Sequence, residues 1–203
     1  GASGIGLLCA ATDAGAIPLA IHPAMTFTGL SMDLQRLNGT SFAVTGPAPF
    51  LPIAQALVVE MGGEPVHVAE ADRALYHAAL AHASNHLVTI LAQSQQMLAS
   101  IGIEDPAHYM GPLVRAAVDN ALASGEGALT GPVARGDAGT VAAHMRALGE
   151  YAQGEKTGDI TDSYAALAHA TAKRAHNRGL LNDEQLERIE SLVEPSANVE
   201  YTG

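Results

Sequence analysis

Residues 17–27 read IPLAIHPAMTF, a short apolar run that gives way at His22-Pro23 to a more polar segment. The apolar run, 17–21, predicts a strand, and the segment after it predicts the loop that leaves the strand. A histidine at this place is held by the sheet and reaches into the crevice beyond the strand ends, where open α/β sheets bind ligands. His22 is therefore a candidate site residue, although its imidazole could instead satisfy neighbouring backbone carbonyls.

The segments around this strand predict an α/β layer. We expect further strands at 41–45 and 65–68, and helices at 4–14, 33–37 and 49–61. In the last of these helices, the spacing of Ile53, Leu57 and Val58 indicates one buried face. Ser3 is the expected cap of the first helix, and Cys9 is most simply a small core residue.

From residue 71 onward the sequence predicts helices alone. Residues 71–101 contain eight Ala and no Pro or Gly, which is typical of one long helix. Shorter helices are expected at 106–124, with a break or kink at Gly111-Pro112, and at 138–148, 160–178 and 182–193. Asn182 is the expected cap of the last helix, and 194–203 the expected frayed tail. The predicted fold class is therefore α/β plus all-α, with an α/β domain at 1–69 and a helical domain at 70–203.

Composition and charge exclude several classes of partner. The net charge is −11, from 21 acidic and 10 basic residues, which repels nucleic-acid phosphates and anionic lipids. The one cysteine cannot form an internal disulfide, and no signal peptide is visible. No apolar stretch approaches the length of about 20 residues that a membrane span needs. We therefore expect a cytoplasmic protein with no nucleic-acid or membrane partner.

The long predicted helix carries a polar stripe in its middle. His82, Asn85, His86 and Thr89 share one helical face. Such a stripe indicates contact either with solvent or with a ligand. His82 and His86 have the i, i+4 spacing of a metal clamp, but no third ligand at a useful spacing accompanies them, so we predict no metal site.

A second polar segment, at 129–137, reads LTGPVARGD and leads into a predicted helix. Its glycines would leave backbone N–H groups free for an anion, and Arg135 adds a planar fork of donors that suits carboxylate or phosphate. The alternative is an ordinary interhelical turn in which Asp137 caps the next helix. Neither a Walker loop nor a GxGxxG fingerprint after a strand occurs, so the sequence lacks a complete cradle for a dinucleotide.

Three segments occur in one order along the chain: LAIHPAMTFTG from residue 19, YHAALAHASNHLV from 76 and LTGPVARGDAGTVAAH from 129. Together they resemble a bacterial family in which a Rossmann-like domain is joined to a C-terminal domain of unknown function. Its wider relatives are the 6-phosphogluconate dehydrogenase-like reductases, among them ketopantoate reductase, prephenate dehydrogenase and pyrroline-5-carboxylate reductase. The resemblance covers nearly the whole chain. It implies the C-terminal part of a Rossmann sheet, followed by a 6-phosphogluconate dehydrogenase-like helical bundle that pairs into a homodimer.

The resemblance also implies an activity, the transfer of hydride from NADPH (or NADH) to a small keto or imino acid. In the family, a cofactor-binding half with the glycine-rich fingerprint precedes the part present here. This chain alone is therefore expected to bind NADP weakly or not at all. A non-catalytic dimeric module that binds a cofactor or metabolite is the alternative.

Individual residues match motifs of these relatives. His22-Pro23 looks like the His-Pro turn that prephenate dehydrogenases place beside the substrate, and Asn85 lies where the reductases carry a substrate-orienting Asn. Their catalytic Lys, four residues earlier, is Ala81 here, and His82 is the expected substitute as proton donor. The resemblance thus implies catalytic roles for His22, His82 and Asn85. We further expect substrate contacts from Ser84, Thr130, Arg135 and Asp137, and cofactor contacts from Pro23 and Met25.

Overall fold

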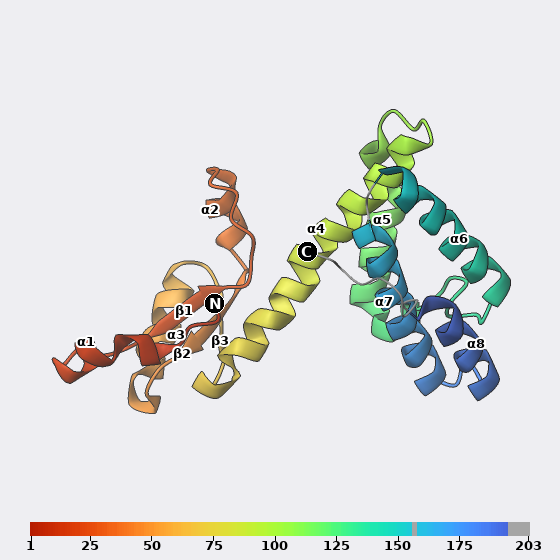
Figure 1. Cartoon of the computed structure of the whole chain (residues 1–203). Coiled ribbons are helices and arrows are strands. Elements are labelled where there is room, and N and C mark those ends of the chain that lie inside the picture. Colours follow the sequence, from red (N-terminus) through yellow and green to blue (C-terminus); the bar gives the residue numbers. More distant parts are fainter. Residues whose placement is uncertain (156–157, 195–203) are drawn as a thin grey trace. The chain divides into compact units, whose positions relative to one another are not determined.

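The computed structural model of the protein describes residues 1–155 and 158–194. Contacts within the chain group these residues into a first unit, Gly1–Thr89, and a second unit that begins at Ile90. The division falls inside one long helix, α4 (Arg73–Ser100), which belongs to the first unit by its first half and to the second by the rest (Figure 1). The sequence places a domain boundary at residues 69 and 70, just before this helix, and that boundary stays a prediction.

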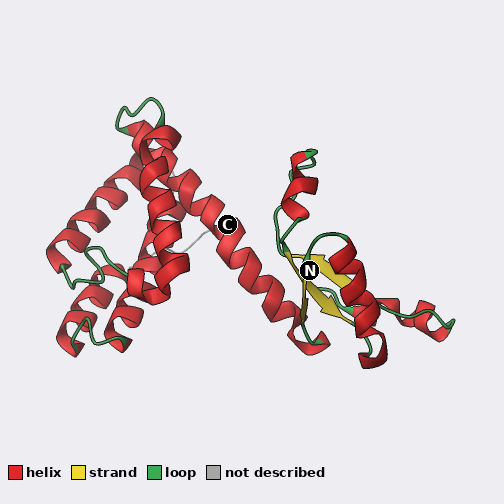
Figure 2. Ribbon diagram, turned by 180° about the vertical axis from the view of Figure 1, so that it is seen from behind, coloured by secondary structure: helices red, strands yellow, loops and turns green. Residues whose placement is uncertain are grey.

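The first unit contains a small sheet of three strands, β1 (Ala20–Pro23), β2 (Ser41–Thr45) and β3 (Glu64–His67), in that order (Figure 2). β1 runs antiparallel to β2, and β2 runs parallel to β3. Together with the predominance of helices elsewhere, this sheet confirms the expected mixture of an α/β layer and helices. The antiparallel β1 is an edge strand, because it pairs with β2 alone among the described residues.

The position of β1 corrects one prediction. The sequence predicts a strand at 17–21, but the observed strand ends at Pro23 and includes His22. Pairing sets these limits, because Ala20 lies opposite Thr45, the last residue of β2, and the residues before Ala20 have no partner in that strand. Pro23 is tolerated because an edge strand does not need every backbone N–H. His22 is therefore fixed inside the strand instead of starting the loop.

The core of the first unit lies between the sheet and helix α3 (Leu51–Glu60), which packs against β2 and β3 (Figure 2). Its buried side chains are Phe42, Val44, Ala54 and Val58. The predicted helix face is largely wrong, since Ile53 is 49% exposed and Leu57 is 48% exposed. Ala54 takes their place because its small side chain lets the helix approach the sheet closely.

The first residues form a 3₁₀ turn, Ile5–Leu8, followed by the short helix α1 (Cys9–Asp13). Ser3 does not cap this segment. The carboxylate of Glu70 does, because it accepts hydrogen bonds from the backbone N–H groups of Ile5 (2.9 Å) and Gly6 (3.0 Å). Cys9 is exposed, which corrects the expectation of a core residue: α1 contributes no buried side chain to the unit.

The second unit is entirely helical across its described residues. Its elements after α4 are α5 (Pro106–Ser124), a 3₁₀ turn at Gly125–Ala128, α6 (Ala138–Glu155), α7 (Gly158–Asn177) and α8 (Asp183–Val193). Helix α5 is not broken at Gly111-Pro112, because a proline removes one helical hydrogen bond without ending the helix when the flanking turns hold, and a kink there stays a prediction. The predicted helix at 138–148 extends further, to Glu155.

Alanines form the core of this helical unit. Ala165, Ala168, Ala172 and Ala175 line one face of α7 and pack with Val141 of α6 and Ile189 of α8, among others. The predicted cap of α8 is confirmed, because Asn182 and Gln185 form reciprocal side-chain to backbone hydrogen bonds. The predicted tail after residue 194 lies outside the described residues. Across the described residues, no helix has the length and apolar character needed to cross a membrane.

Candidate functional site

A cavity of about 330 Å³ lies within the first unit, between the end of β1 and the first half of α4. The β1 side contributes His22 and the residues that follow the strand. The full set of lining residues is His22, Ala24, Met25, Thr26, His77, Leu80, Ala81, Ala83, Ser84 and Asn85. A volume of this size accommodates a small organic ligand, and the mixture of apolar walls with a few polar groups is typical of a ligand site.

Helix α4 presents one of its faces to the cavity. His77, Leu80, Ala81 and Ser84 follow the i, i+3, i+4, i+7 spacing that brings side chains to a common face. The hydroxyl of Ser84 lies 3.0 Å from Oδ1 of Asn85 and 2.8 Å from the backbone carbonyl oxygen of Leu80. The single proton of the Ser84 hydroxyl serves one of these two acceptors, and the amide N–H₂ of Asn85 is the donor that this side chain can offer to a ligand.

His22 reaches the cavity from β1 with one ring nitrogen already engaged. Its Nδ1 lies 3.0 Å from the hydroxyl oxygen of Tyr76 on α4. Burial, followed by nearby positive groups that include Arg73 and His77, lowers the pKa of His22 below its ordinary value of 6.5. Burial also raises the pKa of Tyr76, so its hydroxyl keeps its proton at neutral pH. The direction of this hydrogen bond depends on the tautomer of His22, because a neutral tyrosine hydroxyl can both donate and accept.

A buried arginine, Arg73, lies next to the hydrogen-bonded pair of His22 and Tyr76. Arg73, the first residue of α4, is only 3% exposed, and its guanidinium lies 5.9 Å from the centre of the Tyr76 ring. It donates hydrogen bonds to the carbonyl oxygens of Ala43 (3.5 Å) and Ser3 (3.3 Å) and to Oγ1 of Thr45 (3.3 Å). Its Nε has no partner among the described residues. All its acceptors are neutral, so its positive charge is not cancelled by an ion pair.

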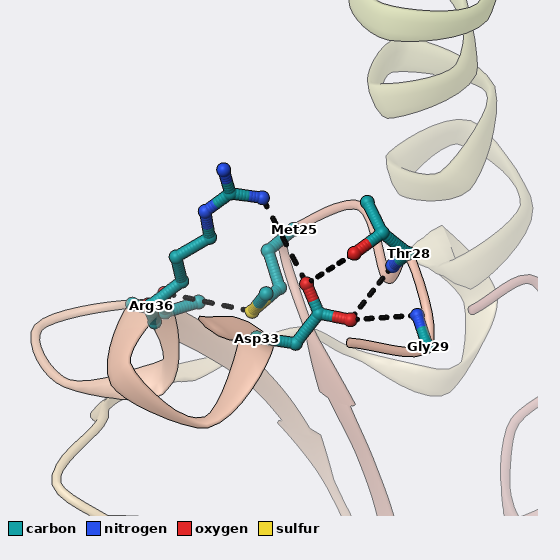
Figure 3. Close-up of polar contacts among 6 residues, drawn as sticks. Met25, Thr28, Gly29, Asp33 and Arg36 are labelled. Carbon is teal, nitrogen blue, oxygen red and sulfur yellow. Dashed lines mark hydrogen bonds and ion pairs between the residues drawn. The ribbon is translucent and has the colours of Figure 1, made fainter. Parts of the chain in front are cut away.

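The buried carboxylate of Asp33 holds the loop between β1 and α2 in place (Figure 3). Asp33, at the start of α2 (Met32–Leu37), accepts hydrogen bonds from the backbone N–H of Thr28 (2.7 Å), the hydroxyl of Thr28 (3.0 Å) and the backbone N–H of Gly29 (2.8 Å). Burial raises the pKa of Asp33, but these hydrogen bonds outweigh burial and hold the pKa below its ordinary value of 3.8. The loop is thus anchored two residues beyond Thr26, which lines the cavity.

Of the site residues that the sequence predicts in the first unit, some line the cavity and others do not. His22, Met25, Ser84 and Asn85 line the cavity together, whereas Pro23 lies in β1 outside the lining. His82 also lies outside it, on an exposed part of α4, with its Nδ1 2.8 Å from Nδ1 of His86. The residues that the structure describes contain no group of three or more side chains able to hold a metal ion.

The predicted segment at 129–137 belongs to the second unit. Val133 and Ala134 are buried in the helical core. Asp137 caps α6, because its carboxylate accepts from the backbone N–H of Thr140 (3.0 Å) and from the Thr140 hydroxyl (2.7 Å), and these two bonds lower the pKa of Asp137. The interhelical turn is therefore confirmed. Thr130 and Arg135 are exposed, and substrate contacts by Thr130, Arg135 and Asp137 stay predictions.

Three residues around the cavity were missed by sequence reasoning: Arg73, Tyr76 and His77. The signal for His77 was present, since it lies seven residues before Ser84 and eight before Asn85, on the same side of the helix. Arg73 and Tyr76 belong to the site because they contact residues of β2 and β1, and no pattern in the sequence predicts those contacts.

Comparisons with known proteins agree with this fold. The model of a family described as "Domain of unknown function (DUF2520)" matches residues 40–171. The crystal structure of protein TM1727 from Thermotoga maritima is 27% identical, with a TM-score of 0.62, over 77% of this chain and 62% of that chain. The "putative NADP oxidoreductase BF3122 from Bacteroides fragilis" is 17% identical, with a TM-score of 0.66, over 85% of this chain and 63% of that chain.

The chain therefore spans slightly less than two thirds of the length of each of these two solved structures. No curated protein matches the chain. The likeness to the Bacteroides fragilis structure concerns the fold alone. The family match is of a different kind, because it extends over more than half of the sequence. This chain is thus a member of the DUF2520 family.

Proposed function

We propose that this chain forms the substrate-binding part of an NADP-dependent oxidoreductase that reduces a small keto or imino acid. The observation that carries the proposal is the cavity of the first unit, which gathers His22 from β1 and Asn85 from α4 around one space. Sequence reasoning singled out these two residues separately, for their strand-end position and their helical phase. The fold shared with the Bacteroides fragilis protein, and the oxidoreductase function in that protein's name, give further support.

The cavity suits one part of a nicotinamide cofactor. Met25, Leu80 and Ala81 provide apolar walls against which a flat ring can pack, next to the polar groups of the lining. The cofactor, when bound, supplies the hydride. The sequence contains no GxGxxG cradle for its phosphates, so the residues of this chain fit the reactive ring and not the whole dinucleotide.

Residues of this chain would donate a hydrogen bond and a proton to the substrate oxygen. Reduction of a carbonyl builds negative charge on that oxygen, and donors placed in advance stabilise the charge. The amide of Asn85 is such a donor. His22, in its imidazolium form, gives the proton that completes the alcohol or amine, while Tyr76 holds the ring by its Nδ1. His22 takes this role here because it lines the cavity and His82 does not.

The proposal is tested with the complete gene product, by following NADPH oxidation in the presence of a panel of 2-oxo acids and cyclic imino acids. Replacing Asn85 by Ala should lower kcat/KM about 100-fold, the usual loss when one donor to a developing charge is removed. Asn177→Ala, at the exposed end of α7, is the matched control and should leave the kinetics unchanged. Oxidation of NADPH by none of the acids would contradict the function, and unchanged kinetics in Asn85→Ala would remove Asn85 from the site.

A second function is favoured by one specific observation. Ala81 lines the cavity at the position where the similar reductases carry a catalytic Lys, and α4 contains no Lys at all. A cavity without that ammonium group suits a module that binds a cofactor or metabolite without turning it over. Tight binding of NADPH by the complete protein, with no oxidation on any acid of the panel, would select this function.

We also propose that the protein is a homodimer. Helix α5 leaves large apolar side chains uncovered, with Leu113 74% exposed and Tyr109 66% exposed, and helices of this kind are commonly covered by a second subunit. Sedimentation equilibrium of the complete protein gives the test. A monomer at micromolar concentration would contradict this part of the proposal.

A further inference from the structure

We infer that His77 binds the carboxylate of the substrate and takes up a proton as it does so, which makes the cavity selective for anionic acids over neutral carbonyl compounds. The inference rests on the proposed function, because it names the part of the acid substrate that His77 recognises. It also makes predictions about binding that hold without turnover.

The first observation is the charge of the cavity lining. Two imidazoles, those of His22 and His77, are the only ionisable side chains among its lining residues. The two rings face one another edge to face, with their centroids 6.0 Å apart and their planes at 74°. No carboxylate lines the space, so an acid that enters meets no like charge. The lining contains no guanidinium or ammonium side chain either, so a positive charge on a lining side chain has to come from an imidazole.

The second observation concerns the ionisable groups that face His77 from the elements around it. His22 faces it from β1, and Arg73 and Tyr76 precede it on α4. Gly1 packs against both imidazoles, and its amino group is one of the positive groups that lower the pKa of His22. Arg73 is buried and donates only to neutral acceptors. Glu70, in the 3₁₀ turn before α4, has its carboxylate occupied by the N–H groups of Ile5 and Gly6. Burial and these positive groups lower the pKa of His22, so they disfavour a proton on that ring.

A bound carboxylate reverses this balance. An anion beside an imidazole favours the charged form of the ring and raises its pKa. His77 is the ring that responds, because His22 already has its Nδ1 against Tyr76, whereas no hydrogen bond to His77 occurs among the described residues. The proton comes from solvent and forms a charge-assisted hydrogen bond between His77 and the carboxylate. His22 and Asn85 are then left to serve the carbonyl oxygen of the same substrate.

This arrangement assigns to His77 the task that the sequence suggests for Arg135. Arg135 is permanently charged, so a cavity built on Arg135 would bind acids without uptake of a proton. A cavity built on His77 binds them with uptake. The number of protons taken up on binding therefore separates the two recognition modes.

The test is isothermal titration calorimetry of the complete protein, near neutral pH, in two buffers that differ in ionisation enthalpy. The probes are unbranched and branched 2-oxo acids of three to six carbons, with 4-methyl-2-oxopentanoate paired with 4-methylpentan-2-one, the ketone that lacks the carboxylate. The expected result is a buffer-dependent enthalpy that corresponds to uptake of most of one proton. The ketone should bind at least about tenfold more weakly, the usual loss for one charge-assisted hydrogen bond.

Two variants at one position separate recognition from a purely structural role. His77→Gln should abolish the proton uptake and weaken acid binding about tenfold. His77→Lys should restore acid binding without any uptake, because its ammonium group is already charged. His108→Gln, on the exposed surface of α5, is the matched control and should behave as the unaltered protein. Proton uptake that persists in His77→Gln would overturn the inference, and so would equal affinity for acid and ketone.

The outcomes distinguish this inference from the proposed function. Acid binding with proton uptake, but without NADPH oxidation, supports the role of His77 and contradicts the oxidoreductase. NADPH oxidation on an acid that binds without uptake contradicts the role of His77 alone. Absence of binding by every acid of the panel, in the presence and absence of NADP⁺, overturns the inference.

Discussion

The cavity at β1 and α4 and the segment at 129–137 look alike in the sequence, since each combines polar residues with a predicted helix. The structure separates them by what their polar groups already do. In the segment, Asp137 caps α6, and Val133 and Ala134 are buried in the core, so the segment is explained as a turn between helices. In the cavity, the amide of Asn85 and the imidazole of His77 line open space. Polar groups without a structural partner are the better guide to a site.

The largest effect is expected at His22. His22→Gln keeps a side chain of similar size but removes the proton donor, so kcat for reduction should fall about 100-fold or more. Steady-state kinetics of the complete protein give the measurement, with His108→Gln as the matched control. If His22→Gln were fully active and Arg135→Ala inactive, the comparison between the two regions would be reversed.

The pH dependence of the reductase activity tests the role of His22 as the proton donor. The pKa of His22 is lowered below 6.5 by burial and by nearby positive groups, and the protonated ring is the form that donates. Reductase activity should therefore decline as the pH rises through that lowered pKa, by about tenfold per pH unit once the ring is mostly neutral. Tyr76→Phe removes the hydrogen bond that holds Nδ1 but keeps the burial and the positive groups that lower the pKa, so it should lower kcat and leave the pH of the decline in place. A decline that moves in Tyr76→Phe would contradict these causes of the lowered pKa.

A substitution of Asp33 tests whether its carboxylate holds the loop between β1 and α2. Asp33→Asn cannot accept all the hydrogen bonds from Thr28 and Gly29, so it should lower Tm and raise KM more than it lowers kcat. The pKa of Asp33 is lower in the folded protein than in the unfolded chain. Its stabilising contribution is therefore full above the unfolded value and is lost as the pH falls through the folded value.

Thermal unfolding measured as a function of pH checks this prediction. The difference in Tm between the unaltered protein and Asp33→Asn should be greatest near neutral pH and should shrink in acid, below the ordinary pKa of 3.8. Asp119→Asn, on the exposed surface of α5, provides the control. A difference that stays constant into strong acid would show that the charge of Asp33 is not what holds the loop.

The smallest kinetic effect is expected in the segment at 129–137. Arg135→Ala, an exposed change, should alter kcat/KM by only about twofold. Asp137→Ala should lower Tm through loss of the α6 cap, with a similarly small kinetic change. A loss of activity in Arg135→Ala as large as that in Asn85→Ala would place the segment in the site and break the comparison.

Local patterns in the sequence predicted the elements well where local chemistry sets them. The alternation in 41–45 predicted β2, and the cap at Asn182 predicted the start of α8. The failures arose where a neighbouring element sets the answer. The limits of β1 depend on where β2 ends, and the buried face of α3 depends on how closely the helix approaches the sheet, which favours Ala54 over Ile53.

The same distinction applies to the site. Strand position, helical phase and the resemblance suggested His22 and Asn85, and the structure brings both to one cavity. Arg73 and Tyr76 were not predicted, because their relation to His22 arises only when α4 packs beside the sheet, whereas the helical spacing of His77 to Ser84 and Asn85 was a signal that sequence reasoning did not use. His82 was predicted because it directly follows Ala81, the position of the relatives' catalytic Lys, but adjacent residues on a helix point about 100° apart, and His82 lies outside the cavity lining.

The central claim is that the cavity of the first unit is the place where an acid substrate binds. A crystal structure of the complete protein with NADP⁺ and a 2-oxo acid that binds in solution tests this claim most directly. We predict the acid between His22 and Asn85, with its carboxylate at His77. An acid bound at the segment 129–137, with the cavity empty, would contradict the account.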